Sequence, residues 1–246
     1  LCKLKFIDYI FRNMAQKENR NEDARMQSVE SAVSRTEGWF ESHQKLVTIV
    51  FAVIIVVALG IISYAKFVKA PKEKDAMVAM YNAEFAFEEE DFELALNGNE
   101  EGVTGFAEIV DEYGSTPSGN VARYCAGVCC MRLGQYEEAI SYLKDFSSDD
   151  PMMEPQALGL MAGAYSELGD NEKAAEYYVK AAEKANNEIL TPKYLIDAGN
   201  VYEILGNYQK ALETYKKVQD EYYTKLNSQD KSNIEKYIQR AELKVK

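Results

Sequence analysis

Three stretches of the chain read LGQYEEAI (133–140), LGDNEKAA (168–175) and LGNYQKAL (205–212). Each begins with Leu-Gly, continues through mostly polar residues and ends in alanine followed by an apolar or small residue. The glycines Gly134, Gly169 and Gly206 are 35 and 37 residues apart. A period of this length predicts a stack of helical hairpins.

The residue types in this pattern explain how such a hairpin is built. Glycine at the second position can end a helix in a left-handed backbone conformation that other residues avoid. Alanine near the end lets the second helix of a hairpin pack closely against the first. Apolar residues before the second copy recur at helical spacing, as Leu158, Met161, Tyr165 and Leu168. The residues expected to define the repeats are Gly134, Ala139, Gly169, Ala174, Gly206 and Ala211.

These residues resemble the tetratricopeptide repeat family, over about residues 120–225. In the first copy the matching residues are Gly127, Gly134, Tyr136, Ala139, Leu143 and Pro151. The second copy has Ala162, Tyr165, Gly169, Ala174, Tyr178 and Ala181, and the third has Gly199, Tyr202, Gly206, Tyr208, Ala211 and Tyr215. The second copy departs from the family at Ala185-Asn186, where no proline follows. The resemblance implies an all-α solenoid of helical hairpins.

Weaker signals extend this solenoid in both directions. Upstream, residues 75–96 and 106–113 read as one more hairpin with a glycine-rich loop inserted between them, and Phe92 and Ala95 echo the motif. Downstream, a last amphipathic helix is predicted to close the stack. Its apolar positions are Ile234, Tyr237, Ile238 and Ala241. We therefore predict an all-α tetratricopeptide-type domain over residues 75–246, with about four hairpins and a capping helix.

An uncharged stretch of 20 residues, LVTIVFAVIIVVALGIISYA at 46–65, lies between Lys45 and Lys66. A helix of that length rises about 30 Å, which is the thickness of the hydrocarbon core of a bilayer. Trp39 before it and Tyr64 at its end suit the interface between lipid and water. We predict one transmembrane helix over 46–65, followed by a linker over 66–74.

The residues before this span are expected to form two segments. Residues 1–25 are predicted to be disordered, and Met14-Ala15-Gln16-Lys17 reads like a natural translation start, which would leave 1–13 untranslated. Over 26–45 the larger side chains alternate at spacings of three and four, which predicts an amphipathic juxtamembrane helix. That helix either leads into the span or offers a seam to a partner helix. The seam consists of Met26, Val29, Val33, Thr36, Phe40, His43 and Val47.

Charge is divided unevenly along the chain. Residues 1–69 carry 10 Lys or Arg and 7 Asp or Glu, whereas residues 70–246 carry 18 and 33. A domain this acidic is repelled by phosphate groups, which argues against nucleic-acid partners and against contact with anionic lipid. Within it, residues 75–122 hold 12 Asp or Glu and no Lys or Arg. This acidic stretch is either a solvated face or a landing surface for basic segments of a partner.

Residues suited to catalysis are scarce. The only histidine is His43, at the predicted membrane boundary, so histidine-based catalysis in the repeat domain is excluded. The sequence contains no phosphate loop, metalloprotease helix or dinucleotide fingerprint. Cys125, Cys129 and Cys130 lack a fourth ligand for zinc, and they are either buried inert thiols or a redox pair. We expect no enzyme activity, no cofactor and no metal.

The family resemblance also implies a partner-binding groove lined by the first helix of each hairpin. The residues implied to face it are Tyr124, Val128, Met131, Arg132, Gly159, Gly163, Ser166, Glu167, Ile196, Asn200 and Glu203. This mixed set lacks the cluster of Lys and Asn with which chaperone-binding relatives hold a C-terminal carboxylate. An apolar or extended peptide is therefore the implied ligand.

Two signals disagree on orientation. Lys66, Lys69, Lys72 and Lys74 follow the span and favour a cytoplasmic repeat domain by the positive-inside rule. The overall layout, with the segment 39–45 before the span, is similar to YfgM-like single-pass bacterial proteins that assist the Sec translocon. That resemblance implies an inner-membrane protein with a cytoplasmic N-terminus and a periplasmic repeat domain, and the lysine count leaves the opposite orientation open.

Together these features predict a membrane-anchored adaptor that binds partner polypeptides. The resemblance implies a periplasmic, chaperone-like factor with translocon subunits as partners. The alternative is an architectural scaffold for an envelope or division assembly that binds no client protein. The sequence leaves open the identity of the partner and the homo-oligomeric state.

Overall fold

The computed structural model describes residues 43–245, and within this range every regular element is a helix. The chain divides into two compact units, residues 1–66 and 67–246, which are described separately. The predicted N-terminal segment 1–25 and all but the last three residues of the predicted juxtamembrane helix 26–45 lie outside the described residues.

The described part of the first unit is dominated by one apolar helix, α2 (Gln44–Tyr64). Its most apolar 18-residue window has a mean hydropathy of 3.1, and none of that window is buried. Length and composition are compatible with a single membrane span, as the sequence predicts. The π-helical turn η1 (Ala65–Lys69) comes next, so the stretch 66–74, expected to be a linker, is helical.

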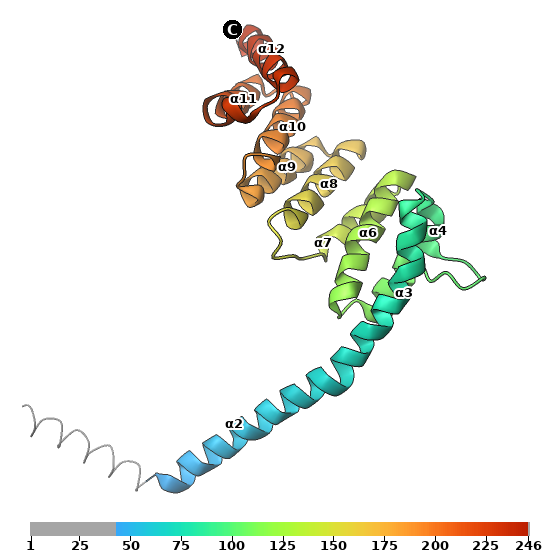
Figure 1. Ribbon diagram of the computed structural model, residues 1–246. Helices are drawn as coiled ribbons and strands as arrows, with labels where there is room; N and C mark the ends of the chain where they lie inside the picture. The colour runs from blue at the N-terminus through green and yellow to red at the C-terminus, as the bar shows by residue number, and fades with distance from the viewer. Residues whose placement is uncertain (1–42, 246) are drawn as a thin grey trace, which may run out of the picture. The chain divides into compact units, whose positions relative to one another are not determined.

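The second unit is a row of four helical hairpins followed by one more helix (Figure 1). Each second helix also packs against the first helix of the next hairpin, so the stack is continuous. The first hairpin consists of α3 (Ala70–Glu88) with α4 (Phe92–Asn97) and α5 (Phe106–Tyr113), and the second of α6 (Pro117–Leu133) and α7 (Tyr136–Lys144). The third hairpin consists of α8 (Met153–Glu167) and α9 (Asn171–Ala185), and the fourth of α10 (Leu190–Ile204) and α11 (Tyr208–Tyr222). The short helix η2 (Tyr223–Lys225) and the last helix α12 (Ser228–Val245) follow.

The repeated glycines make the turns within the last three hairpins. Gly134, Gly169 and Gly206 have φ angles of 76°, 79° and 70°, in the left-handed region where a side chain is strained. In the third and fourth hairpins the next residue then caps the second helix. The side chains of Asp170 and Asn207 accept hydrogen bonds from backbone N–H groups of α9 and α11. Each of the three glycines thus ends the first helix of its hairpin in a left-handed backbone conformation.

Small residues let the two helices of each hairpin approach closely. The repeated alanines Ala139, Ala174 and Ala211 are all 0% exposed. A β-carbon added at Gly127 would lie 2.5 Å from the Leu143 side chain of the second helix, and one added at Gly199 would lie 2.3 Å from the Tyr215 ring. The signature positions therefore mark real contacts between helices.

The first hairpin differs from its prediction. Residues 75–96 do not form one arm, because the chain turns between α3 and α4. Glu90, at the position that glycine has in the other repeats, has a φ of 62°, and Asp91 caps α4 by accepting from the Leu94 N–H. The second arm of this hairpin is thus α4 and α5 together, separated by the glycine-rich loop.

The C-terminal end of the stack is closed by α12, as predicted. Ile234, Ile238 and Ala241 are 0%, 7% and 0% exposed and belong to the core that the last hairpin shares with α12. The opposite face of α12 carries the exposed charged residues that solvent requires.

Candidate interaction surface

The residues implied to line the groove all lie on first helices of hairpins, namely α6, α8 and α10. Neighbouring first helices bring some of them together. A β-carbon placed at Gly163 on α8 would lie 3.6 Å from the Cε atom of Met131 on α6. The Tyr124 hydroxyl is 3.5 Å from Oε1 of Gln156, a residue of α8 that was not predicted. These contacts define a surface that crosses from one hairpin to the next.

Two members of the predicted set serve packing within the stack. Gly159 is buried, and a β-carbon there would lie 2.4 Å from the Tyr194 ring of α10. Arg132 turns toward the first hairpin, with its guanidinium 5.0 Å from the centre of the Phe92 ring on α4. Such a contact between a cation and an aromatic face is favourable, so this arginine already has a partner within the chain.

Ile196 lines a pocket of about 410 Å³ between the start of α10 and the residues that lead into α12. Its rim carries both signs of charge, and Lys225 and Glu188 form an ion pair of 2.8 Å across it. Pro192 and Leu226 add apolar surface. The predicted groove includes only Ile196 of this pocket. Pro192, Lys193 and Asp197 lie on α10 at other positions, and the remaining lining residues come from outside the first helices.

Asp197 is a half-buried acidic residue in the lining of this pocket. Burial raises the pKa of its carboxyl group, and the nearby Lys193 ammonium opposes that rise. Burial also raises the pKa of the neighbouring Tyr178 to about 12, with a smaller contribution from the charge of Asp197. A cationic group entering the pocket would favour the charged form of this carboxyl.

Asn200 and Glu203 line a second pocket, of about 440 Å³, at the other end of α10. Both are already held in place. Glu203 forms an ion pair of 2.6 Å with Arg240 of α12, and Oδ1 of Asn200 accepts from the Tyr215 hydroxyl at 2.8 Å. Ile204, which is 66% exposed, provides an apolar wall that sequence reasoning missed.

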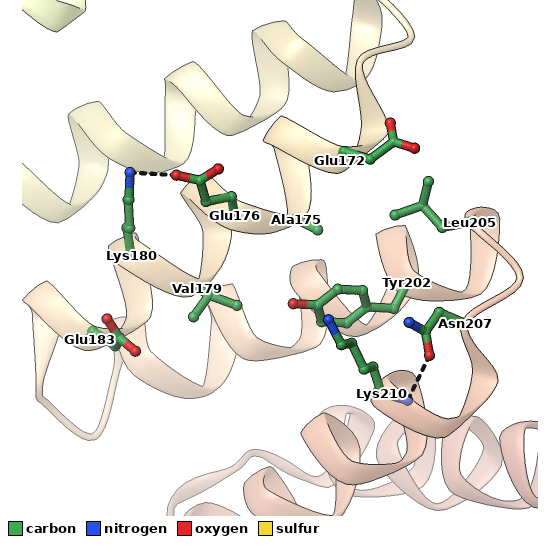
Figure 2. A pocket seen from close by; sticks show the side chains of 10 residues that line it. All are labelled: Glu172, Ala175, Glu176, Val179, Lys180, Glu183, Tyr202, Leu205, Asn207 and Lys210. Carbon is green, nitrogen blue, oxygen red and sulfur yellow. Dashed lines mark hydrogen bonds and ion pairs between the residues drawn. The ribbon is translucent and has the colours of Figure 1, made fainter.

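A further pocket, of about 660 Å³, lies away from the predicted groove, between α9, the end of α10 and the start of α11 (Figure 2). Its apolar lining comes from Ala175, Val179, Tyr202 and Leu205. Figure 2 shows charged side chains around this lining, among them Lys180 in an ion pair of 2.6 Å with Glu176. No spacing signal in the sequence marks it, because its lining comes from three helices of two hairpins.

The three cysteines of α6 lie in or against the core of the first two hairpins, which favours inert thiols over a redox pair. Cys129 and Cys130 are buried and Cys125 is half-buried, and all three are free. Burial raises the thiol pKa to about 12 for Cys125 and Cys129 and to about 11 for Cys130. Because the thiolate is the reactive form, these residues are poor nucleophiles at neutral pH. Within residues 43–245 no three His, Cys, Asp or Glu side chains group as metal ligands.

Comparison with known proteins agrees with this geometry. Residues 160–223, from within α8 to the start of η2, match the family model described as tetratricopeptide repeat. Over these residues the third and fourth hairpins are therefore similar to tetratricopeptide repeats. No curated protein matches the chain.

Solved structures with a similar fold include two crystal structures of MamA. One is 18% identical, covers 69% of this chain and 91% of its own, and superposes with a TM-score of 0.47. The other is 20% identical, covers 56% of this chain and 88% of its own, and has a TM-score of 0.39.

Proposed function

We propose that this protein is a membrane-anchored adaptor that binds partner polypeptides along its stack of hairpins. The observation that carries the proposal is the combination of two features. One is a row of tetratricopeptide-type hairpins whose first helices leave mixed apolar and charged surface exposed. The other is the fully exposed apolar helix α2, which has the length of a membrane span.

The surface along α10 suits a peptide rather than a small molecule. Its two pockets lie toward opposite ends of one helix, and Ile196 of the first pocket is about one helical turn from Asn200 of the second. An extended or apolar segment can lie along this helix, with apolar contacts to Ile196 and Ile204 and polar contacts at the charged rims. The anionic Asp197 favours a segment that carries a basic residue.

A photoreactive benzoylphenylalanine at Ile196 tests this function directly. In membranes of cells that express the full chain, irradiation should link Ile196→benzoylphenylalanine to polypeptides that mass spectrometry identifies. The same residue at Lys217, exposed on the second helix α11, is the control and should give few products. Products at both positions alike, or at neither, would contradict binding along the first helices.

We further propose that the repeat domain is periplasmic and that the partners include subunits of the Sec translocon. This location is supported by the resemblance of the chain's layout to that of YfgM-like proteins, whereas the lysines that follow the span favour the opposite orientation. Crosslinked products drawn only from envelope or division proteins would favour the architectural alternative.

Orientation can be measured at Ser228, which is exposed at the start of α12. Ser228→Cys, in a chain without its native cysteines, should react with a membrane-impermeant maleimide in intact spheroplasts. A cysteine introduced near the N-terminus should react only after lysis. The reverse pattern would place the repeat domain in the cytoplasm.

A further inference from the structure

Helix α3 carries large apolar side chains on the face that points away from its own hairpin. Met77, Val78, Tyr81 and Phe85 are 61%, 74%, 72% and 62% exposed. The opposite face, which includes Ala76, Met80, Ala83 and Ala86, is buried in the core of the first two hairpins. The exposed residues recur about one helical turn apart, so they form a continuous stripe along α3. We call Met77, Val78, Tyr81 and Phe85 the α3 stripe.

The equivalent positions in the other repeats show whether the residues of this stripe lie on a face that is normally buried. When the repeats are superposed on their signature alanines, with Ala95 taking that place in the first hairpin, Val78 and Phe85 have counterparts in every first helix. The counterparts of Val78 are Ala122, Ala157 and Tyr194, and those of Phe85 are Cys129, Ala164 and Val201. All six counterparts are 4% exposed or less.

The preceding hairpin buries these positions in the rest of the stack. On α10, Val201 packs in one cluster with Ala174 and Ala175 of α9. Tyr194 of the same helix stacks on Tyr178 of α9 with ring centres 6.4 Å apart. Val78 and Phe85 of the α3 stripe therefore lie at stacking positions of a repeat, and none of the described residues supplies a preceding helix to cover them.

The other end of the stack indicates what kind of element covers such a face. There a single amphipathic helix, α12, packs on the last hairpin and buries Ile234, Ile238 and Ala241. An amphipathic helix is thus sufficient to complete this solenoid, which agrees with the general need of repeat stacks for a closing element.

Charge decides where the covering helix comes from. The 12 acidic residues between Asp75 and Ala122 are all exposed, and this stretch contains no Lys or Arg. The six ion pairs found among the described residues all lie further along the chain, between residues 154 and 242. A second copy of the chain in a symmetric dimer would place an equally acidic surface against this one, which is repulsive.

The N-terminal part of this chain is also a poor candidate for the helix that covers the α3 stripe. Residues 1–42 contain seven Lys or Arg and seven Asp or Glu, so they offer no excess of positive charge. In a single-span topology they also lie on the opposite side of the membrane from α3.

We propose that the α3 stripe docks a basic amphipathic helix of a partner protein, which packs on α3 as an additional helix of the stack. Its apolar side would contact Tyr81 and Phe85, and its Lys or Arg side chains would meet Glu84 and Glu88, which follow Tyr81 and Phe85 by three residues. This inference names a partner class for the proposed adaptor and rests on that role, but it uses a surface separate from the first-helix groove.

The test uses the full chain in nanodiscs of zwitterionic lipid and a fluorescent amphipathic helical peptide of Leu and Lys. Fluorescence anisotropy should show binding to loaded discs and not to empty ones, and a scrambled peptide of the same composition should bind about tenfold more weakly. Y81S/F85S should weaken binding by about tenfold or more. E84Q/E88Q should weaken it by several-fold and reduce its dependence on salt.

A matched control removes exposed apolar side chains elsewhere. Leu243 and Val245 are 73% and 43% exposed, and L243S/V245S should bind the peptide like the unaltered chain. Equal binding of the scrambled peptide, or unchanged binding by Y81S/F85S, would overturn the proposal.

The number of chains per disc tests whether a second copy of this chain, and not a partner protein, covers the α3 stripe. Two chains per disc that become one in Y81S/F85S would show that a second copy covers the stripe, and this outcome also overturns the proposal. If the peptide fails to bind while Ile196 still crosslinks to polypeptides, the docking helix is wrong and the adaptor function stands.

Discussion

Replacing Tyr215 by alanine is expected to lower the free energy of unfolding by about 3–5 kcal/mol, the range seen when large buried aromatic residues are truncated. Tyr215 is 0% exposed and belongs to the core shared by the last hairpin and α12. Its ring lies directly over Gly199 of α10 and 5.3 Å from the ring of Tyr237 on α12, measured between centres. One side chain thus joins three helices, and alanine would leave a cavity at their junction.

Two further variants separate the ring from the hydroxyl group. Tyr215→Phe keeps the ring but removes the hydrogen bond of 2.8 Å to Asn200, and it should cost about 1 kcal/mol. Tyr81→Ala removes an equal side chain that is 72% exposed, and it should change stability by less than about 0.5 kcal/mol. Chemical denaturation of a fragment spanning residues 71–246 measures all three variants. Similar costs for Tyr215→Ala and Tyr81→Ala would contradict the packing described for the last hairpin.

The sequence predicted the last three hairpins well because their signals are local. A glycine in a left-handed backbone conformation and an alanine packed against a facing helix recur at a fixed spacing, and the structure has both. The first hairpin lacks this glycine. Glu90 adopts the left-handed conformation without being glycine, so the turn between α3 and α4 could not be distinguished from a continuing helix.

The candidate surface was less predictable because it depends on contacts between hairpins. Gly159 fits the first-helix pattern, but the Tyr194 ring that occupies the space beside it comes from the next hairpin, 35 residues further along the chain. The pocket between α9, α10 and α11 likewise assembles from helices of two hairpins. Periodicity identifies which residues share a face of one helix, but it does not show which side chain of a neighbouring helix lies against that face.

The α3 stripe shows how a repeat pattern can disclose function once the structure is known. Exposed apolar residues on one helix are unremarkable singly. Val78 and Phe85 acquire meaning because the same positions are buried in the three other first helices. In a repeat protein, the burial of equivalent positions in the other repeats therefore shows whether an exposed apolar residue lies at a position that is normally covered.

Overpacking at a repeat alanine gives the second large expected effect. Ala174 is 0% exposed and lies in a cluster with Val201, and Tyr165 of its own hairpin and Tyr202 of the next pack against this cluster. Ala174→Leu adds three carbon atoms to this close-packed contact and should cost about 1–3 kcal/mol. Because each repeat contacts only its neighbours, the loss should extend to the interface between the third and fourth hairpins.

Glu172, two residues earlier on α9, is the matched control for the same introduced side chain. It is exposed, so Glu172→Leu should change the free energy of unfolding by less than about 0.5 kcal/mol. Both variants can be compared by chemical denaturation of residues 71–246. Hydrogen exchange should become faster in α9 and α10 of Ala174→Leu, because these helices flank the altered contact, and remain close to the unaltered rates in α4 and α5. Equal costs for the two substitutions would show that Ala174 is not the residue on which the third and fourth hairpins pack.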